Sequence, residues 1–152
     1  MKGRRFLAGT VGALVLVLVT VGLVGLAQAK PNKPRFTILP SDNTWVLDST
    51  TALQWQRAPD FVGGSWSTAS TYCTNLGSGA RLPEIKELIS LVEYNNFNPA
   101  LPEGHPFQGI QSAGYWSATT GGLELFNGWV VDFSSGSVNN ILDSKRFAWC
   151  VR

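Results

Sequence analysis

The uncharged apolar run at residues 6–26 constrains this chain most, because it decides which residues must fold and in which compartment. The run follows a basic segment, residues 1–5, and precedes Ala27-Gln28-Ala29, a small-residue cleavage pattern. We therefore predict that residues 1–29 are a signal peptide, removed before Lys30. The alternative is an uncleaved anchor, because an apolar run of this length can also cross a bilayer.

Removing the signal peptide changes the charge balance. The whole chain has 12 Lys and Arg against 10 Asp and Glu. The first 29 residues contain Lys2, Arg4 and Arg5 but no acidic residue, so the mature chain is close to neutral. Near-neutrality argues against a nucleic-acid partner. A membrane contact is expected only through the N-terminal segment, if that segment is retained.

The predicted export also affects how the two cysteines, Cys73 and Cys150, are interpreted. Outside the cytoplasm, two cysteines in a small domain are first interpreted as one disulfide. The alternative is two free thiols, one of them reactive, but no neighbouring His, Lys or C-x-x-C motif supports it. Two cysteines and one histidine cannot form a four-ligand zinc site, and we expect no metal and no cofactor.

Two helices are predicted in the first half of the mature chain. In residues 65–76, apolar side chains recur at helical spacing, Ser65 is a candidate N-cap, and Gly77 can end the helix. Cys73 lies on the apolar stripe of this helix. Residues 82–94 form the second predicted helix, with Pro83 in the first turn and acidic residues near the N-terminal end.

The remaining segments predict β-structure and loops. Residues 45–48 and 53–56 flank a polar turn and predict a hairpin, and residues 30–44 predict a linker in which residues 35–39 could add a short strand. Residues 95–114 predict a long loop. Residues 115–118, 129–133, 137–138 and 147–151 predict strands. Helices followed by antiparallel strands indicate an α+β domain at residues 45–152.

Several motifs resemble the domain at the C-terminus of the Legionella collagen-like adhesin, and they occur in that family's order. They are Leu53-Gln54-Trp55-Gln56, Trp66-x-x-Ala69-x-x-Tyr72-Cys73-x-x-Leu76, Arg81-Leu82-Pro83-x-x-Lys86-Glu87-Leu88, Tyr115-Trp116-Ser117, Trp129-x-Val131-Asp132-Phe133-x-x-Gly136-x-Val138 and Cys150-Val151-Arg152. The sequence departs from the family at Ala80, where Trp is frequent, and at Ala52 and Gln54, which replace Gly and Met.

This resemblance implies a C-type-lectin-like fold, with two helices, antiparallel strands, long loops and a disulfide from the first helix to the last strand. It also implies binding to sulfated polysaccharides. The mature chain, however, has no basic cluster. Calcium-dependent sugar binding is not expected either, because Glu103, Glu124 and Asp132 are too few and too scattered to coordinate the ion.

Catalysis is not predicted. His105 is the single histidine and lies in a Gly/Pro-containing loop, and the serines that it could activate, Ser134 and Ser135, lie in a predicted turn rather than in a nucleophile elbow. Arg81 and Asp132 are assigned structural roles, with Arg81 expected to be partly buried and to form a salt bridge near Asp132 or Glu87.

We therefore expect an exported, non-catalytic binding or adhesion module that contacts a glycan or a cell-surface protein. The alternative is a structural or assembly domain of the bacterial envelope. The chain is expected to be secreted, periplasmic or on the cell surface. The candidate ligand surface combines the long loop, residues 121–128 and a strand face carrying Asn127, Trp129, Asn139 and Asn140, with Trp129 partly exposed. Trp55, Trp66, Trp116 and Trp149 are expected in the core.

Overall fold

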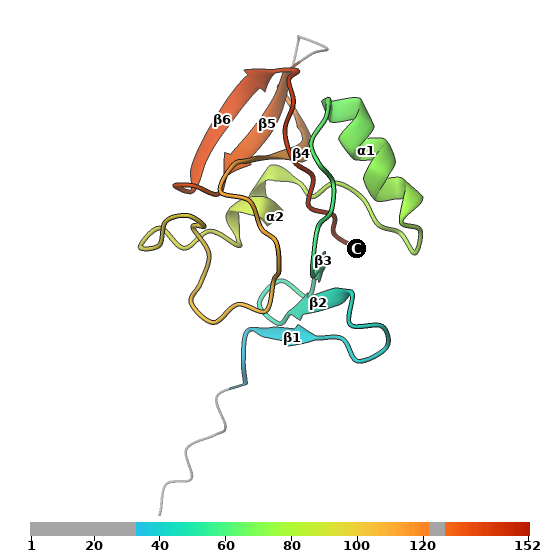
Figure 1. Cartoon of the computed structure of the whole chain (residues 1–152), viewed down its shortest axis with the longest axis vertical. Coiled ribbons are helices and arrows are strands. Elements are labelled where there is room, and N and C mark those ends of the chain that lie inside the picture. The colour runs from blue at the N-terminus through green and yellow to red at the C-terminus, as the bar shows by residue number, and fades with distance from the viewer. Residues whose placement is uncertain (1–32, 122–126) are drawn as a thin grey trace, which may run out of the picture. The chain divides into compact units, whose positions relative to one another are not determined.

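The structure, a computed structural model, describes residues 33–121 and 127–152. The predicted signal peptide, residues 1–29, and the start of the predicted linker lie outside these ranges. In the described part of the chain, no helix is long and apolar enough to cross a membrane. These residues form two helices and two three-stranded antiparallel sheets, which are labelled in Figure 1.

The first sheet has the order β1-β2-β3, with β1 at Phe36–Ile38, β2 at Trp45–Asp48 and β3 at Gln54–Gln56. Strands β2 and β3 form the predicted hairpin, in which Trp45 pairs with Gln56 and Leu47 with Gln54. The turn is stabilised by Asp48, whose Oδ1 accepts a 2.9 Å hydrogen bond from the backbone N–H of Thr50. The predicted hairpin is therefore confirmed.

Part of the predicted linker belongs to the folded unit. Strand β1 pairs with β2, and it matches the short strand expected within residues 35–39. Just before it, Arg35 donates hydrogen bonds to Asp48 and, over 2.6 Å, to the backbone oxygen of Ser90. The chain is thus attached to both the hairpin and the second helical region before residue 45.

The second sheet has the order β4-β5-β6, with β4 at Gly114–Thr120, β5 at Asn127–Asp132 and β6 at Ser137–Leu142. β4 and β6 contain the segments predicted at residues 115–118 and 137–138, and β5 contains the segment predicted at 129–133 except Phe133. Strand β6 extends further than predicted. The ladder between β5 and β6 is continuous from Asn127–Leu142 to Asp132–Ser137. Figure 1 shows β6 on the outer side of this sheet.

The predicted strand at residues 147–151 is wrong as a continuous element. Its residues form isolated bridges instead, with Phe147 next to Tyr115, and Val151 next to both Trp55 and Arg81. The backbone N–H of Gln56 also donates to the oxygen of Cys150 over 3.0 Å. Because this segment divides its backbone hydrogen bonds among several neighbours, it forms no single ladder, and it connects the two sheets.

Helix α1, Trp66–Asn75, confirms the first predicted helix. The Ser65 side chain accepts a hydrogen bond from the backbone N–H of Thr68, as an N-cap does, and Gly77 follows the end of the helix with φ +71°. Cys73 faces the interior and forms a disulfide with Cys150, with a Cα–Cα distance of 5.4 Å. The predicted disulfide is confirmed, and it joins α1 to the final segment.

Helix α2 is much shorter than predicted, because it covers only Ile85–Ile89. Its start is delayed because Glu84 is an extended N-cap with a capping box, while the oxygen of Pro83 accepts a hydrogen bond from Ala118 in β4. After Ser90 the helical pattern is lost, and the N–H of Glu93 donates to Ala100. The apolar periodicity of residues 82–94 therefore persists through turns that no longer belong to the helix.

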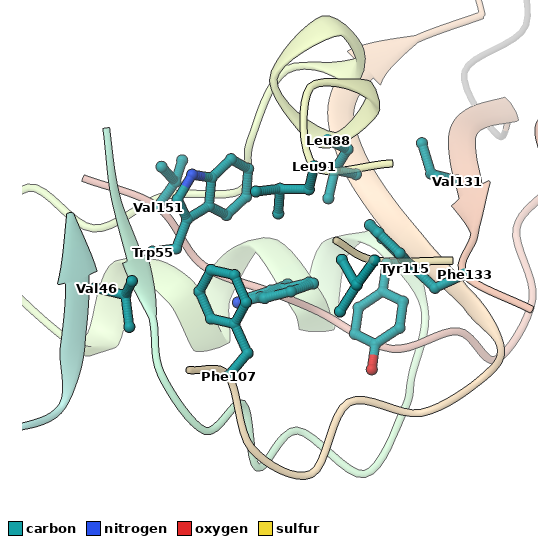
Figure 2. Close-up of a cluster of buried hydrophobic side chains, with 11 residues drawn as sticks. Val46, Trp55, Leu88, Leu91, Phe107, Tyr115, Val131, Phe133 and Val151 are labelled. Atoms are coloured by element: carbon teal, nitrogen blue, oxygen red, sulfur yellow. The ribbon is translucent and has the colours of Figure 1, made fainter. Parts of the chain in front are cut away.

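Two buried clusters lie on opposite sides of the first sheet. Trp55 and Val46 face the first cluster, in which Trp149 and Phe107 meet edge to face with their ring centroids 4.8 Å apart. Figure 2 shows side chains from β2, β3, α2, β4 and β5 meeting in this cluster. The second cluster contains Trp45 and both cysteines. The largest completely buried side chains are thus aromatic, led by Trp55, Trp116 and Trp149.

The core predictions for tryptophan are largely confirmed. Trp55, Trp116 and Trp149 are completely buried. Trp66 is only half-buried: it packs against the second cluster and donates from Nε1 to the backbone oxygen of Ser117 over 2.8 Å. The α+β class, the two helices, the antiparallel strands and the disulfide are all present, whereas the C-type-lectin-like assignment stays a prediction.

Candidate functional site

The residues predicted to bind a ligand lie on β5 and β6, but they do not share one face. Trp129 pairs with Asn140, and Val130 with Asn139. Opposite residues of an antiparallel pair project to the same face, and neighbours alternate. Trp129, which is half-buried, and the exposed Asn140 therefore lie on one face, and the exposed Asn139 lies on the other.

The rest of that predicted surface is only partly described. The backbone of Asn127 pairs with Leu142, but its side chain lies outside the description. Residues 122–126 of the predicted surface loop also lie outside the described residues. The structure thus brings Trp129 and Asn140 together, and it places Asn139 away from them.

Of the two acidic neighbours proposed for Arg81, the structure selects Glu87. Two guanidinium nitrogens of Arg81 donate to the two carboxylate oxygens of Glu87, each over 2.8 Å. These hydrogen bonds hold the pKa of Glu87 below its usual range. Glu87 also accepts from the backbone N–H of Glu84, so Arg81 supports the capping box of α2. Arg81 is more exposed than expected, with 44% of its side chain accessible.

Asp132 has a separate, local role in the turn between β5 and β6. Its Oδ1 accepts from the backbone N–H of Ser134 over 2.8 Å, and its backbone oxygen accepts from Gly136 over 2.7 Å. Asp132 therefore shapes the turn and forms no ion pair with Arg81.

His105 lies in the long loop, with its ring centroid 5.7 Å from that of Phe107. Its Nδ1 is buried and has no hydrogen-bond partner among the described residues. Burial lowers the pKa of His105 below its ordinary value. No hydrogen bond joins its ring to Ser134 or Ser135, and within residues 33–121 and 127–152 no three His, Cys, Asp or Glu side chains gather as a potential metal site.

A cleft of about 480 Å³ lies where β2 begins and β3 ends. We call it the Arg152 cleft. It combines residues from the β1–β2 loop, the segment after β3, the end of α1, the long loop and the chain's last residue. Its lining is Asp42, Asn43, Thr44, Trp45, Gln56, Arg57, Ala58, Asp60, Leu76, Ser78, Gln108 and Arg152.

Arg152 is held in this cleft by two uncharged neighbours. Its guanidinium carbon lies 4.2 Å from the centroid of the Trp45 ring, which is a cation–π contact. Its Nε donates to the side-chain oxygen of Gln54 over 2.9 Å. The backbones of Arg152 and Gln54 also exchange two 2.9 Å hydrogen bonds, so the base of this side chain is anchored to β3. No described carboxylate forms an ion pair with Arg152.

Arg57, the second arginine of the cleft, is held mainly through its backbone. Its N–H donates to Thr44 over 2.7 Å, and its oxygen accepts from Gln108 over 2.8 Å. The side chain makes only long contacts, from Nε to the oxygen of Pro106 at 3.5 Å and from Nη1 to that of Asn43 at 3.4 Å. Arg57 also forms no ion pair with a described carboxylate.

A polar chain runs from the cleft to α1. Gln56 is 9% exposed and donates from Nε2 to the hydroxyl of Tyr72 over 2.8 Å, while that hydroxyl donates to Asp60. Burial and the hydrogen bond to Asp60 raise the pKa of Tyr72 above its ordinary value, so it is neutral at physiological pH. The Oε1 atom of Gln56 is buried without a partner. These hydrogen-bonded side chains connect the segment after β3 to α1.

Backbone conformation marks two lining residues on different loops. Asn43 has φ 58° and Ser78 has φ 52°. These values lie in the left-handed region of backbone conformation, which residues other than glycine seldom adopt. Such conformations are often found at ligand-binding loops. Asn43 and Ser78 lie on two loops that line the same cleft, whereas Ala52 and Asn98, which also have positive φ, lie outside it.

The side-chain charges of the Arg152 cleft are balanced, because Arg57 and Arg152 are accompanied by Asp42 and Asp60. A backbone hydrogen bond from Thr44 is the largest cause that lowers the pKa of Asp42, and the charge of Arg152 also contributes. A balanced polar cleft is suited to small polar groups, and much less to a long polyanion.

Sequence reasoning missed this cleft, although two of its residues lie at recognisable positions. Trp45 opens the predicted hairpin, and Arg152 ends the Cys150-Val151-Arg152 motif. Nothing in their spacing brings together residues more than 100 positions apart. The signal that could have found them is the disulfide, because fixing Cys150 beside α1 also places Arg152 near the hairpin.

The comparisons with known proteins point to one family. A family model described as the Lcl C-terminal domain matches residues 44–152. No curated protein and no solved structure matches the chain. The match includes every residue of the Arg152 cleft except Asp42 and Asn43.

Proposed function

Because the chain belongs to the Lcl C-terminal domain family, we propose that it is an exported, non-catalytic binding module that contacts a glycan or a surface protein through the Arg152 cleft. The observation that carries this proposal is the cleft itself, which is concave and lined by two arginines without an ion-pair partner among the described acids. Pockets with a few well-placed polar groups are the usual sites of ligand binding.

The family and the disulfide support an extracellular or envelope location. Cys73 and Cys150 are both completely buried, and such structural disulfides are typical of oxidising compartments. Secretion, the periplasm and the cell surface are all consistent with this, and the proposal requires only that the domain be exported.

The cleft chemistry favours a small polar ligand. Asn43, Gln56 and Gln108 line it together with Trp45. Amides and aromatic rings are frequent contacts of sugars, and the balanced charges favour neutral or weakly charged groups. The cleft volume also lies within the range of ordinary small-ligand sites.

A glycan array and a panel of exported surface proteins test the proposal. The exported protein is applied at high concentration, with and without calcium, beside the Arg57→Ala variant. Binding that weakens in this variant supports the cleft. Failure to bind any glycan or surface protein contradicts the proposed function, and binding that the variant leaves unchanged moves it to another surface.

A structural or assembly role in the envelope is the second candidate, and one observation favours it. Tyr94 and Phe97 lie close together in the chain, after α2, and are 61% and 66% exposed. Exposed aromatic side chains near each other often contact another protein. A pull-down from envelope extract should then recover a stoichiometric partner with the parent protein but not with the Phe97→Ser variant. If both proteins recover the same partner, this role is contradicted.

A further inference from the structure

We propose that the Arg152 cleft binds the free C-terminal carboxylate of a peptide or protein. The inference rests on the proposed function, because it names the chemistry of the ligand at the same site. It is carried by the fixed guanidinium of Arg152, the second cation at Arg57 and the apolar contacts beside them.

The setting of Arg152 suits one carboxylate. The Trp45 ring supports its guanidinium at 4.2 Å, and Gln54 binds its Nε, so both Nη groups keep hydrogen atoms to donate. A planar guanidinium held by its Nε and its face recognises a carboxylate through two parallel hydrogen bonds. Because Trp45 and Gln54 are neutral, neither of them offsets the charge of the Arg152 guanidinium.

Arg57 adds a second positive charge to the same cleft. Its side chain is half-buried and makes only long contacts with two carbonyl oxygens, at 3.4 and 3.5 Å. These weak contacts leave its strongest donor capacity unused. A carboxylate in the cleft therefore meets two cations, and neither of them is neutralised by an ion pair with a described acid.

The acidic residues limit how much negative charge the ligand can carry. Asp42 and Asp60 are exposed and line the same cleft. A polymer with repeated anionic groups places several of them against these carboxylates, and like charges at a rim disfavour such a partner. A chain end brings a single carboxylate and avoids this repulsion.

One further feature favours a peptide end over an acidic sugar. Leu76 is 40% exposed and Ala58 is also exposed, so the lining offers apolar contact to the last side chain of a peptide.

The test compares two probes that differ only in the terminal group, a carboxylate in N-acetyl-L-leucine and a neutral amide in N-acetyl-L-leucinamide. Each is titrated into the exported protein and followed by NMR chemical shifts. The acid should bind at least about tenfold more tightly than the amide, because only the acid can pair with Arg152. Arg152→Gln and Arg57→Gln should each remove most of that preference, and Arg152→Lys should retain part of it.

Lys86→Gln is the matched control, because Lys86 is an exposed cation on α2 outside the cleft. It should leave the acid preference unchanged. Each variant is first shown to form the Cys73–Cys150 disulfide and to unfold at the temperature of the parent protein, and Arg57→Gln replaces any Arg152 variant that fails this check.

Equal binding of the acid and the amide overturns the inference. The inference is also overturned if the protein binds D-galacturonic acid more tightly than D-galactose and binds neither peptide probe. That result would assign the cleft to sugar acids. These results leave the proposed binding function standing. The proposed function itself fails only if the glycan and protein panels also give no ligand.

Discussion

Arg35 binds both carboxylate oxygens of Asp48, with 3.0 Å between Nε and Oδ1 and 2.7 Å between Nη2 and Oδ2. Asp48 is completely buried, and it also accepts the turn hydrogen bond from Thr50. Burial alone would raise the pKa of Asp48, but these hydrogen bonds outweigh burial and hold the pKa below its ordinary value. The residue is thus an ionised acid at the junction of β1, the hairpin and the α2 region.

Replacing this acid should destabilise the fold. Asp48→Asn removes the charge that Arg35 pairs with, and we expect the free energy of unfolding to fall by about 3 kcal/mol. Urea denaturation followed by tryptophan fluorescence measures the change. Asp42→Asn is the control: it removes an exposed acid, and it should change stability by no more than about 0.5 kcal/mol. Equal effects of the two variants would show that the ion pair contributes nothing.

Breaking the disulfide should also have a large effect. Cys73 and Cys150 are 77 residues apart, and joining them restricts the unfolded chain. The double variant Cys73→Ala/Cys150→Ala should lose about 4 kcal/mol of stability. Denaturation of the parent protein with and without a reductant provides a second measurement. If reduction leaves the denaturation midpoint unchanged, the loop-closure argument is wrong for this domain.

Stability should depend on pH through His105. Its pKa in the folded protein is below the ordinary value of 6.5, so the unfolded chain binds a proton first as the pH falls. The stabilisation is therefore complete above pH 6.5 and is lost as the pH falls through the folded pKa. The acids Asp48 and Glu87 act at lower pH, below their ordinary values of 3.8 and 4.5.

The His105→Gln variant isolates this contribution. Thermal unfolding of the parent protein and the variant is compared in steps between pH 8 and pH 5. The parent should lose stability below pH 6.5 more steeply than the variant does. Parallel profiles of the two proteins would exclude His105 as the cause.

Two glycines separate the effect of backbone strain from that of a steric clash. Gly136 has φ +76°, and a Cβ there would lie 2.5 Å from Cγ1 of Val92. Gly104 has φ +72°, and a Cβ there would meet open space, with no atom beyond its chain neighbours within 4 Å. Gly104→Ala should lower the free energy of unfolding by about 1 kcal/mol through backbone strain alone. Gly136→Ala should lower it by about 3 kcal/mol, because strain and the clash with Val92 add together.

Chemical denaturation of both variants measures the difference. A larger loss for Gly104→Ala than for Gly136→Ala would contradict the packing of Val92 against the β5–β6 turn. Similar small losses would show that Val92 moves aside at little cost.

Local signals predicted the elements whose stabilising contacts are close in sequence. Ser65 and the apolar stripe through Cys73 predicted α1, and the polar turn next to Asp48 predicted the β2–β3 hairpin. The same periodicity overextended α2, because residues 90–94 keep their apolar pattern while the backbone leaves the helix. The N–H groups of Leu91 and Val92 donate to the residue three positions earlier, and the N–H of Glu93 donates to Ala100.

The candidate site shows the opposite situation. Trp129 and Asn140 share a face and Asn139 does not, and this follows from the register of β5 and β6, which the sequence alone does not contain. The Arg152 cleft was not predicted, because the residues that line it come from distant segments. Each of them has an ordinary sequence setting on its own.

The sequence by itself determined the α+β class, the disulfide partners, the cap of α1 and most of the tryptophan core, because periodicity, capping and the number of cysteines act through near neighbours or through residue type. The tertiary structure decided the end of α2, the divided hydrogen bonding of residues 147–151, the pairing of Arg35 with Asp48 and the position of Arg152 on Trp45. Those depend on long-range packing, in which a backbone or charged group takes whichever partner the assembled core brings within reach.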